Sequence, residues 1–382
     1  YHVPGAQLGY WNGIARTTLS DWQTATGQDL NALEINPQYM SDSNLHVSNV
    51  LLNGAGLFQA LVPQDIDGES RQNPPDIGAD EFDPSIANDA GVFMAVGPHA
   101  PFAHGSQPIN LAIKNFGTDT LTSVNVRWVV NGIEQPLYTW TGALPSAQCD
   151  TVTIGTFNFP EYTAHDLIYW TESPNSIPDS TSVNDTIHLT NVYPALSGLY
   201  TVGGVLPDFN LFSQLENALG YGGILNDVTF SIRNGTYVSQ LLIQNFPRLS
   251  MAHTVTFTSE SGDSSLVKLT RNFTASNANN FTVSFKDAHG IRFENISLAS
   301  TKGRVLELTE GSSNITVAHC HITGVDLLDN YSGYELIYSG TTSEDSIFIH
   351  HNRFENGGQG IYMIGSSGDK EKHHVFEYNG FY

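Results

Sequence analysis

The chain has 382 residues, enough for two or three domains, and its 38 acidic and 15 basic residues give a formal net charge of −23. Nucleic acid and anionic membrane surfaces are bound through clustered lysine and arginine, so this balance argues against both as partners. Two cysteines cannot form a disulfide framework, and the sequence holds no apolar stretch that predicts direct membrane insertion.

The first segment, residues 1–87, is mixed and carries one helix signal. Thr18 or Ser20 is a candidate N-cap for a short helix that Gly27 would end. The segment closes with residues 65–82, which are rich in Gly, Pro and Asp and therefore break regular structure.

The second segment, residues 88–194, contains short alternating runs about a dozen residues apart. Asn131-Gly132 and Asn115-Phe-Gly117 mark turns between runs. About seven short strands in about a hundred residues are typical of an Ig-like β-sandwich. The runs are Ile109–Ile113, Val124–Val130, Leu137–Trp140, Val152–Ile154, Leu167–Trp170 and Thr186–Leu189.

The third segment, residues 195–382, opens with a helix signal and continues with strand-like runs only. Asp208 is the expected N-cap of an amphipathic helix over Phe209–Leu219, and Gly220 is its expected stop. Because a solenoid needs caps at its ends, we interpret this helix as a cap over a first coil.

Four short segments near the C-terminus repeat one pattern, with apolar residues at alternate positions, a polar bend and a closing apolar residue. Their spacing falls in the range of about 20–50 residues that indicates a solenoid. Aligned residues are Phe293, Val317, Ile349 and Phe376, and the bend column is Asn295, His319, His351 and Tyr378. The copies are Ile291–Leu298, Ile315–Ile322, Ile347–Phe354 and His374–Phe381.

The sequence also resembles a known family. Residues 65–71 and 75–82 resemble the closing segment of right-handed parallel β-helix domains in large secreted bacterial proteins, and residues 21–29 match an element that precedes it there. Residues 115–121 with 128–132 resemble the Ig-like, cell-adhesion-related modules between such domains. The opening of another β-helix of this kind is similar to residues 196–204, 207–209 and 235–237.

This resemblance implies very large surface proteins exported by the type 9 secretion system, including gliding and attachment adhesins. The expected fold is all-β, with right-handed parallel β-helix segments flanking an Ig-like β-sandwich. Residues 1–87 would end a first β-helix, residues 88–194 form the sandwich, and residues 195–382 begin a second β-helix that the C-terminus truncates.

The expected function is that of a segment of a giant adhesin at the cell surface, a structural stalk that binds extracellular polysaccharide or a solid surface and performs no catalysis. Attachment to the outer membrane and contact with the secretion machinery would use parts outside this segment. The alternative is a polysaccharide lyase or glycoside hydrolase with its groove on the second β-helix. Candidate carboxylates for that chemistry are Glu294, Glu355, Asp326 and Asp329, although the repeat forces no two of them together.

Tyrosines around the longest insertion are the candidate carbohydrate contacts, because exposed aromatic rings stack on sugars. Core packing is the favoured role for at least half of them. These residues are Tyr331, Tyr334, Tyr338 and Tyr362.

No cofactor is expected, although two patterns could hold a metal. His319 and His351 would be neighbours in adjacent coils and could share an ion, but the simpler interpretation is a polar bend column. Asp65, Asp67 and Glu69 have the alternating oxygens of a calcium loop, but they lack its twelve-residue frame, so turn formation is favoured.

The resemblance also implies O-glycosylation, since bacteria with this export system modify Asp-Ser/Thr followed by an aliphatic residue or Thr. Such tripeptides also arise by chance in a chain rich in Asp and Thr. The candidate acceptors are Thr120, Thr151, Ser180, Thr186 and Ser346.

Overall fold

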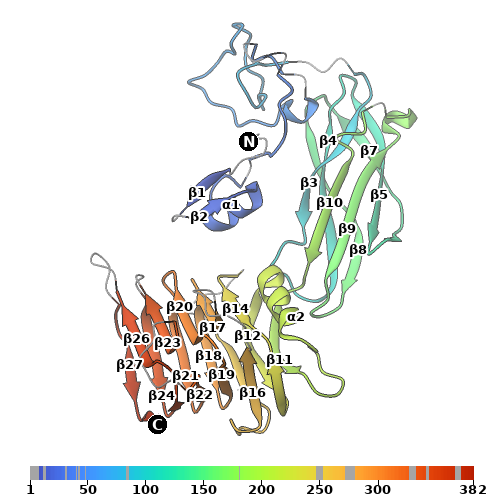
Figure 1. The fold of residues 1–382 in the computed structure, drawn as a ribbon. Coiled ribbons are helices and arrows are strands. Elements are labelled where there is room, and N and C mark those ends of the chain that lie inside the picture. Colours follow the sequence, from blue (N-terminus) through green and yellow to red (C-terminus); the bar gives the residue numbers. More distant parts are fainter. Residues whose placement is uncertain are drawn as a thin grey trace. The chain divides into compact units, whose positions relative to one another are not determined.

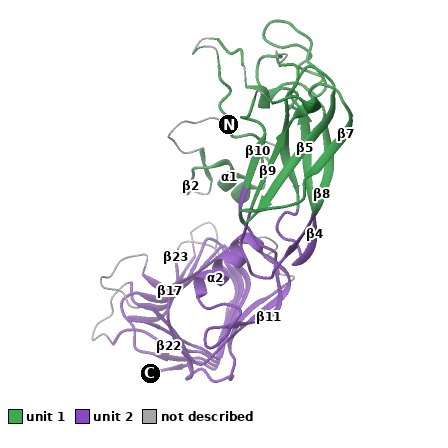
Figure 2. Cartoon of the chain, turned by 90° about the vertical axis from the view of Figure 1, so that its right-hand side faces the viewer, with its two compact units in different colours: residues 1–97, 109–155, 167–188 green, residues 98–108, 156–166, 189–382 purple. Residues whose placement is uncertain are grey.

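The computed structural model describes residues 8–11, 14–30, 32–39, 41, 44–47, 49–82, 86–179, 181–246, 253–271, 280–326, 333–340, 344–365 and 371–382. The chain divides into two compact units (Figure 2). Unit 1 comprises residues 1–97, 109–155 and 167–188, and unit 2 comprises residues 98–108, 156–166 and 189–382. No helix in the described part of the chain is long and apolar enough to cross a membrane.

The first part of unit 1 has little regular structure. β1 (Gly9–Trp11) pairs antiparallel with β2 (Ile14–Arg16), α1 (Leu19–Thr26) follows, and η1 (Val50–Leu52) is a single 3-10 turn. As expected, Thr18 caps α1 by accepting a hydrogen bond from the N–H of Asp21. The described part of residues 8–82 contains no parallel strand pair, so its assignment to the end of a first β-helix stays a prediction.

The sandwich has a three-stranded and a five-stranded sheet, which confirms the Ig-like prediction (Figure 1). Trp128 and Tyr169, each 1% exposed, fill its core, and the ring of Trp128 packs on Gly155 of the facing sheet. A 3-10 turn, η2 (Pro174–Ser176), follows β9. The strands are β3 (Ala90–Gly97), β4 (Gly105–Asn115) and β8 (Cys149–Phe159) in one sheet, and β5 (Leu121–Val130), β6 (Ile133–Glu134), β7 (Tyr138–Leu144), β9 (His165–Glu172) and β10 (Thr186–Val192) in the other.

Unit 2 contains a parallel β-helix of three sheets, and Figure 2 shows β11, β22 and β17, one strand of each sheet, on different sides of the unit. Sheet A contains β11 (Leu196–Val202), β12 (Ile224–Ile232), β15 (Val255–Ser259), β18 (His289–Glu294), β21 (Ser313–Ala318), β24 (Asp345–His350) and β27 (Val375–Glu377). Sheet B contains β13 (Gly235–Val238), β16 (Val267–Arg271), β19 (Ser297–Ser300), β22 (His321–Thr323), β25 (Arg353–Glu355) and β28 (Gly380–Phe381). Sheet C contains β14 (Leu241–Gln244), β17 (Phe281–Lys286), β20 (Arg304–Thr309), β23 (Glu335–Gly340) and β26 (Gln359–Ile364).

The register of sheet A confirms the predicted alignment of the four copies. Phe293 pairs with Val317, Val317 with Ile349, and Ile349 with Phe376. The same column also continues backwards through Phe257, Phe230 and Tyr200, which the repeat pattern missed. Aromatic rings therefore pack along the core from the first coil. Each coil buries the apolar face of the coil next to it.

The bend between sheets A and B has one backbone conformation in the last four coils. Asn295, His319, His351 and Tyr378 all have φ between 53° and 57°, the left-handed region that reverses the chain locally. The rings of His319 and His351 stack with centroids 5.0 Å apart, and those of His351 and Tyr378 with centroids 4.9 Å apart. The predicted polar bend column is therefore present.

A ladder of amide groups follows this bend. Asn352, 3% exposed, accepts a hydrogen bond from the N–H of Cys320 at 2.9 Å and donates to the carbonyl of Val317 at 2.8 Å. Asn379 repeats the arrangement one coil later by donating to the carbonyl of Ile349. The amides thus satisfy backbone groups that the bend leaves without strand partners.

We expect Asn352→Ala to lower the free energy of unfolding by about 1–3 kcal/mol, because it leaves a buried N–H and a buried carbonyl unpaired. Urea denaturation followed by circular dichroism measures the loss. Asn226→Ala is the control, since Asn226 is exposed and its amide donates to the hydroxyl of Ser197. Equal losses in the two variants would contradict the role of the ladder.

The helix at the start of unit 2 is shorter than predicted, and Asp208 does not cap it. The backbone of Phe209 exchanges hydrogen bonds with Thr201 and Gly203, so residue 209 is extended rather than helical. The Asp208 carboxylate accepts from the N–H and hydroxyl of Thr201. Instead, the side chain of Gln214 accepts from the N–H groups of residues 210 and 211.

The observed helix is α2 (Phe212–Asn217), extended by a π-helical turn, η3 (Ala218–Gly222), so the expected stop at Gly220 moves to Gly223 with φ 70°. Phe212, Leu215 and Leu219 belong to the same core cluster as the ladder. The predicted capping role therefore agrees with the packing, although the helix boundaries differ.

Candidate functional site

Two stacked tyrosines lie on the outer face of sheet C. Ile337 and Ile361 pack in the core, so Tyr338 and Tyr362, the next residues along β23 and β26, point to the opposite face. Their ring centroids are 5.6 Å apart and their planes differ by 4°. The register of sheet C places these residues side by side, one coil apart.

Arg304 locks this stack in place. Its Cζ lies 3.3 Å from the ring centroid of Tyr338, its Nε donates to Glu335 at 3.1 Å, and its Nη1 pairs with Glu307. Glu335 is 2% exposed, and Glu307 also accepts from Ser284 at 3.2 Å. We call Arg304, Glu307, Glu335, Tyr338 and Tyr362 the tyrosine–arginine cluster.

The charge of Arg304 is firmly held. Burial opposes that charge, but the hydrogen bonds and charges of Glu307 and Glu335 outweigh burial and raise the pKa of Arg304. One face of the Tyr338 ring meets Arg304 and the other meets Tyr362. The cluster therefore offers hydroxyl groups and ring edges to a ligand, in a geometry fixed by a buried ion pair.

The other two predicted tyrosines, Tyr331 and Tyr334, do not add to this cluster as the structure describes it. Tyr334 lies just before β23, where its backbone carbonyl accepts a hydrogen bond from the N–H of Gly358. Tyr331 falls outside the described residues. A carbohydrate role for all four tyrosines stays a prediction, and among the three that the structure describes, Tyr338 and Tyr362 stack on each other.

The histidine column contains a third ring that the sequence argument did not include. Ring nitrogens of His319, His350 and His351 lie within 4.8 Å of one another. Burial, together with the nearby His351 and His319, lowers the pKa of His350, which favours the neutral form of that ring. Because His319 and His351 stack face to face, we retain the interpretation of a packed bend column.

The carboxylates proposed for catalysis do not form a pair among the described residues. Glu294 is bonded to Arg292 at 2.6 Å, and Glu355 is bonded to His321 and Arg353 at 2.6 and 2.8 Å. Hydrogen bonds from Arg353 and His321 lower the pKa of Glu355, the opposite of what a general acid requires. Asp326 is exposed, and Asp329 lies outside the described residues.

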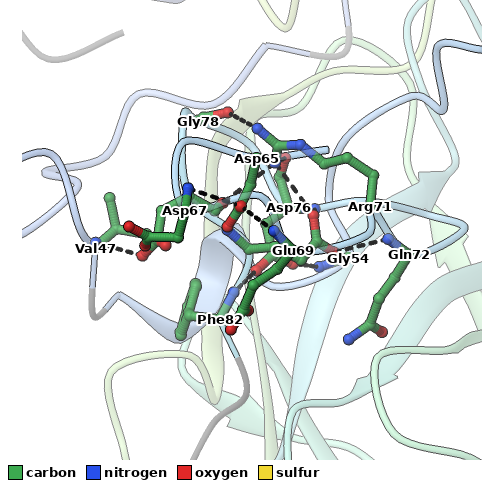
Figure 3. Close-up of polar contacts among 12 residues, drawn as sticks. Val47, Gly54, Asp65, Asp67, Glu69, Arg71, Gln72, Asp76, Gly78 and Phe82 are labelled. Carbon is green, nitrogen blue, oxygen red and sulfur yellow. Dashed lines mark hydrogen bonds and ion pairs between the residues drawn. The ribbon is translucent and has the colours of Figure 1, made fainter. Parts of the chain in front are cut away.

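The acidic segment before residue 82 uses its carboxylates to fold the loop, as Figure 3 shows. The Asp65 carboxylate accepts from the N–H groups of Asp67, Glu69 and Glu81 at 2.7–3.0 Å. Burial opposes its charge, but these bonds hold the pKa of Asp65 below its ordinary value. Asp76 likewise accepts from the N–H groups of Gly54 and Phe82. Turn formation therefore accounts for this motif.

The candidate glycosylation acceptors occupy varied positions. Thr120, Thr151 and Thr186 are exposed. Ser346 is half-buried in β24 and its hydroxyl donates to Asp345, while Ser180 lies outside the described residues. Glycosylation of any of them stays a prediction.

A scan against protein-family models and a search of curated proteins found no match. Among solved structures, the chain is similar to a CARDB domain from Pyrococcus furiosus, described as a complex with di-metal ions (17% identity, TM-score 0.23, 27% of this chain and 86% of that one). It is also similar to a pectin methylesterase from Aspergillus niger (15%, 0.30, 50% and 77%) and to the catalytic domain of a GH87 alpha-1,3-glucanase (10%, 0.27, 72% and 59%). Likenesses at this level say nothing about activity.

Proposed function

We propose that this chain is a segment of a secreted cell-surface adhesin, with the β-helix as a stiff stalk and the tyrosine–arginine cluster as its carbohydrate-contacting face. The observation that carries the proposal is the Tyr338–Tyr362 stack, held by Arg304 on the outside of sheet C. Hydroxyl groups and ring edges held in a fixed orientation suit contact with the hydroxyl-bearing edges of sugars. Export by a type 9 secretion system and a part in gliding belong to the same proposal and rest on the sequence resemblance.

The continuous ladders support the stalk role. In the described part of the chain, pairing along sheets A, B and C leaves free strand edges only at the ends of the stack, and the rings of Phe230, Phe257 and Phe293 pack in the core. A net charge of −23 suits an extracellular protein that contacts polysaccharide rather than nucleic acid. The polysaccharide-cleaving alternative has no carboxylate pair among Glu294, Glu355 and Asp326 to support it.

A glycan array, followed by affinity measurement on the best ligand, tests the carbohydrate role. We expect Tyr362→Ala to weaken binding by up to about ten-fold, since an aromatic contact contributes about 0.5–1.5 kcal/mol. The control is Tyr378→Ala, which removes an exposed ring stacked on His351 in the bend between sheets A and B. An array without binding, or equal loss in both variants, would contradict this face.

The same polysaccharides should be incubated with the chain in a depolymerisation assay. No cleavage is expected. Cleavage that disappears in Glu355→Gln or Asp326→Asn would replace the adhesin proposal with the enzyme alternative.

A further inference from the structure

Three aspartates meet at one end of the sandwich strands, and Asp89 lies far in the sequence from Asp179 and Asp185. Asp89 directly precedes β3, Asp185 directly precedes β10, and Asp179 lies between η2 and β10. Each offers a carboxylate oxygen, and these oxygens lie within 4.8 Å of one another. Like charges at this distance repel, so the arrangement needs a compensating interaction.

A second observation concerns buried oxygens at the same place. Asp89 is fully buried and Asn184 is 3% exposed. Oδ2 of Asp89, Oδ1 of Asp185 and Oδ1 of Asn184 are all buried and have no hydrogen-bond partner among the described residues. The Asn184 amide nitrogen donates to Oδ1 of Asp89 at 2.8 Å, which leaves its own oxygen open. Buried oxygens are normally paired, so several unpaired ones together favour a set of cation ligands.

Backbone contacts hold the cluster in a fixed geometry. The Asp179 carboxylate accepts from the N–H groups of Ala90 at 3.2 Å and Thr181 at 2.9 Å. The Thr171 hydroxyl donates to the carbonyl of Ala90 at 2.6 Å, and its N–H donates to the carbonyl of Asp185 at 3.2 Å. Thr171 of strand β9 therefore connects the start of β3, next to Asp89, with the start of β10, next to Asp185.

The electrostatics fit the same site. Burial raises the pKa of Asp89 to about 6 and that of Asp185 to about 7, and the charge of Asp179 acts in the same direction on both. Asp185 is also affected by Asp89. The charged side chains that act on these two carboxylates are thus other aspartates, a concentration of negative charge that a cation would neutralise.

We propose that Asp89, Asp179 and Asp185 bind one calcium ion in the sandwich, with the amide oxygen of Asn184 as a candidate further ligand. Calcium takes oxygen ligands at about 2.3–2.6 Å, so two ligands on opposite sides of the ion lie about 5 Å apart. The three carboxylate oxygens meet this limit without rearrangement. An all-oxygen, carboxylate-rich site favours such a hard cation over zinc or copper.

The test uses the full chain, treated with EDTA and then titrated with CaCl2 by calorimetry, with thermal unfolding measured in parallel. We expect one tight site and a Tm that rises with calcium and falls again on chelation. Asp185→Asn and Asp89→Asn should each weaken calcium binding on the order of ten-fold or more, because affinity follows ligand charge.

Two controls separate this site from other acidic residues. Asp67→Asn alters another acidic group, near His46 and Asp80, and Asp119→Asn alters an exposed aspartate of the sandwich. Both should bind calcium as the unsubstituted chain does. Bound calcium, measured by atomic emission after gel filtration of the unsubstituted chain, gives a result even if Asp89→Asn does not fold. No bound calcium and no Tm shift at millimolar CaCl2, or an unchanged response in Asp185→Asn, would overturn the proposal.

Discussion

Replacement of Phe293 by alanine should lower the free energy of unfolding of the β-helix by about 3–5 kcal/mol. The side chain is fully buried, stacks on Phe257 with centroids 4.6 Å apart and meets the edge of Phe285 at 5.5 Å. Its removal opens a cavity between two coils, and neighbouring strands held by ladders in three sheets cannot collapse into it. Chemical denaturation followed by circular dichroism measures the loss.

Phe376→Ala is the matched control for this prediction. It occupies the same column of sheet A, but Phe376 is 43% exposed, so less apolar contact is lost. We expect a clearly smaller change, and a Phe293→Leu variant should fall between the two. Equal losses for Phe293→Ala and Phe376→Ala would show that the column does not stabilise the stack through buried ring contacts.

Arg304→Ala should also destabilise the protein by about 3–5 kcal/mol, because it leaves two buried carboxylates without their cation. The side chains of Arg304, Glu307 and Glu335 are 13%, 11% and 2% exposed, so water cannot replace the lost partner fully. Denaturation measures the loss, and glycan affinity should fall with it if Arg304 orients the Tyr338 ring.

Arg353→Ala provides the comparison, since Arg353 also pairs with a glutamate and lies over a tyrosine ring, but with its side chain 53% exposed. Its removal should change stability far less. Adding Glu307→Gln and Glu335→Gln to Arg304→Ala should restore part of the stability by removing the unpaired charges. If the triple variant is no more stable than Arg304→Ala, the loss does not come from unpaired charge.

Much of the β-helix could be predicted because its pattern is local. Alternating apolar residues set the phase of each strand, and a polar residue after each run marks a bend, so the columns through Phe293 and His319 followed from the sequence. The earlier strands through Phe230 and Phe257 were predicted as strand-like runs, but their place in the same column was not, because they are not followed by the closing pattern of the later copies. The prediction that Asp208 caps the helix was wrong, because backbone pairing of Phe209 with β11 overrides the local preference for a helix.

The tyrosine–arginine cluster was harder to predict because its geometry depends on the strand register of sheet C. The repeated copies span sheets A and B only, so they gave no register for Arg304 and Glu335, which are paired across one coil in sheet C. Tyr338 and Tyr362 were named as candidates, but their stacking follows from the same unseen register. The aspartate cluster left no local signal at all, because Asp89 and Asp185 meet only through the closing of the sandwich.

The connections between the three sheets differ in how much they vary. In the last four coils the bend from sheet A to sheet B always joins the strands through two residues, whereas the connections on either side of sheet C differ widely in length. In these four coils, sequence insertions are thus confined to the two borders of the sheet that carries the tyrosine–arginine cluster. A related chain could therefore lengthen a loop beside sheet C in one coil at a time. The two-residue bend between sheets A and B, which fixes the register of the coils, would stay unchanged.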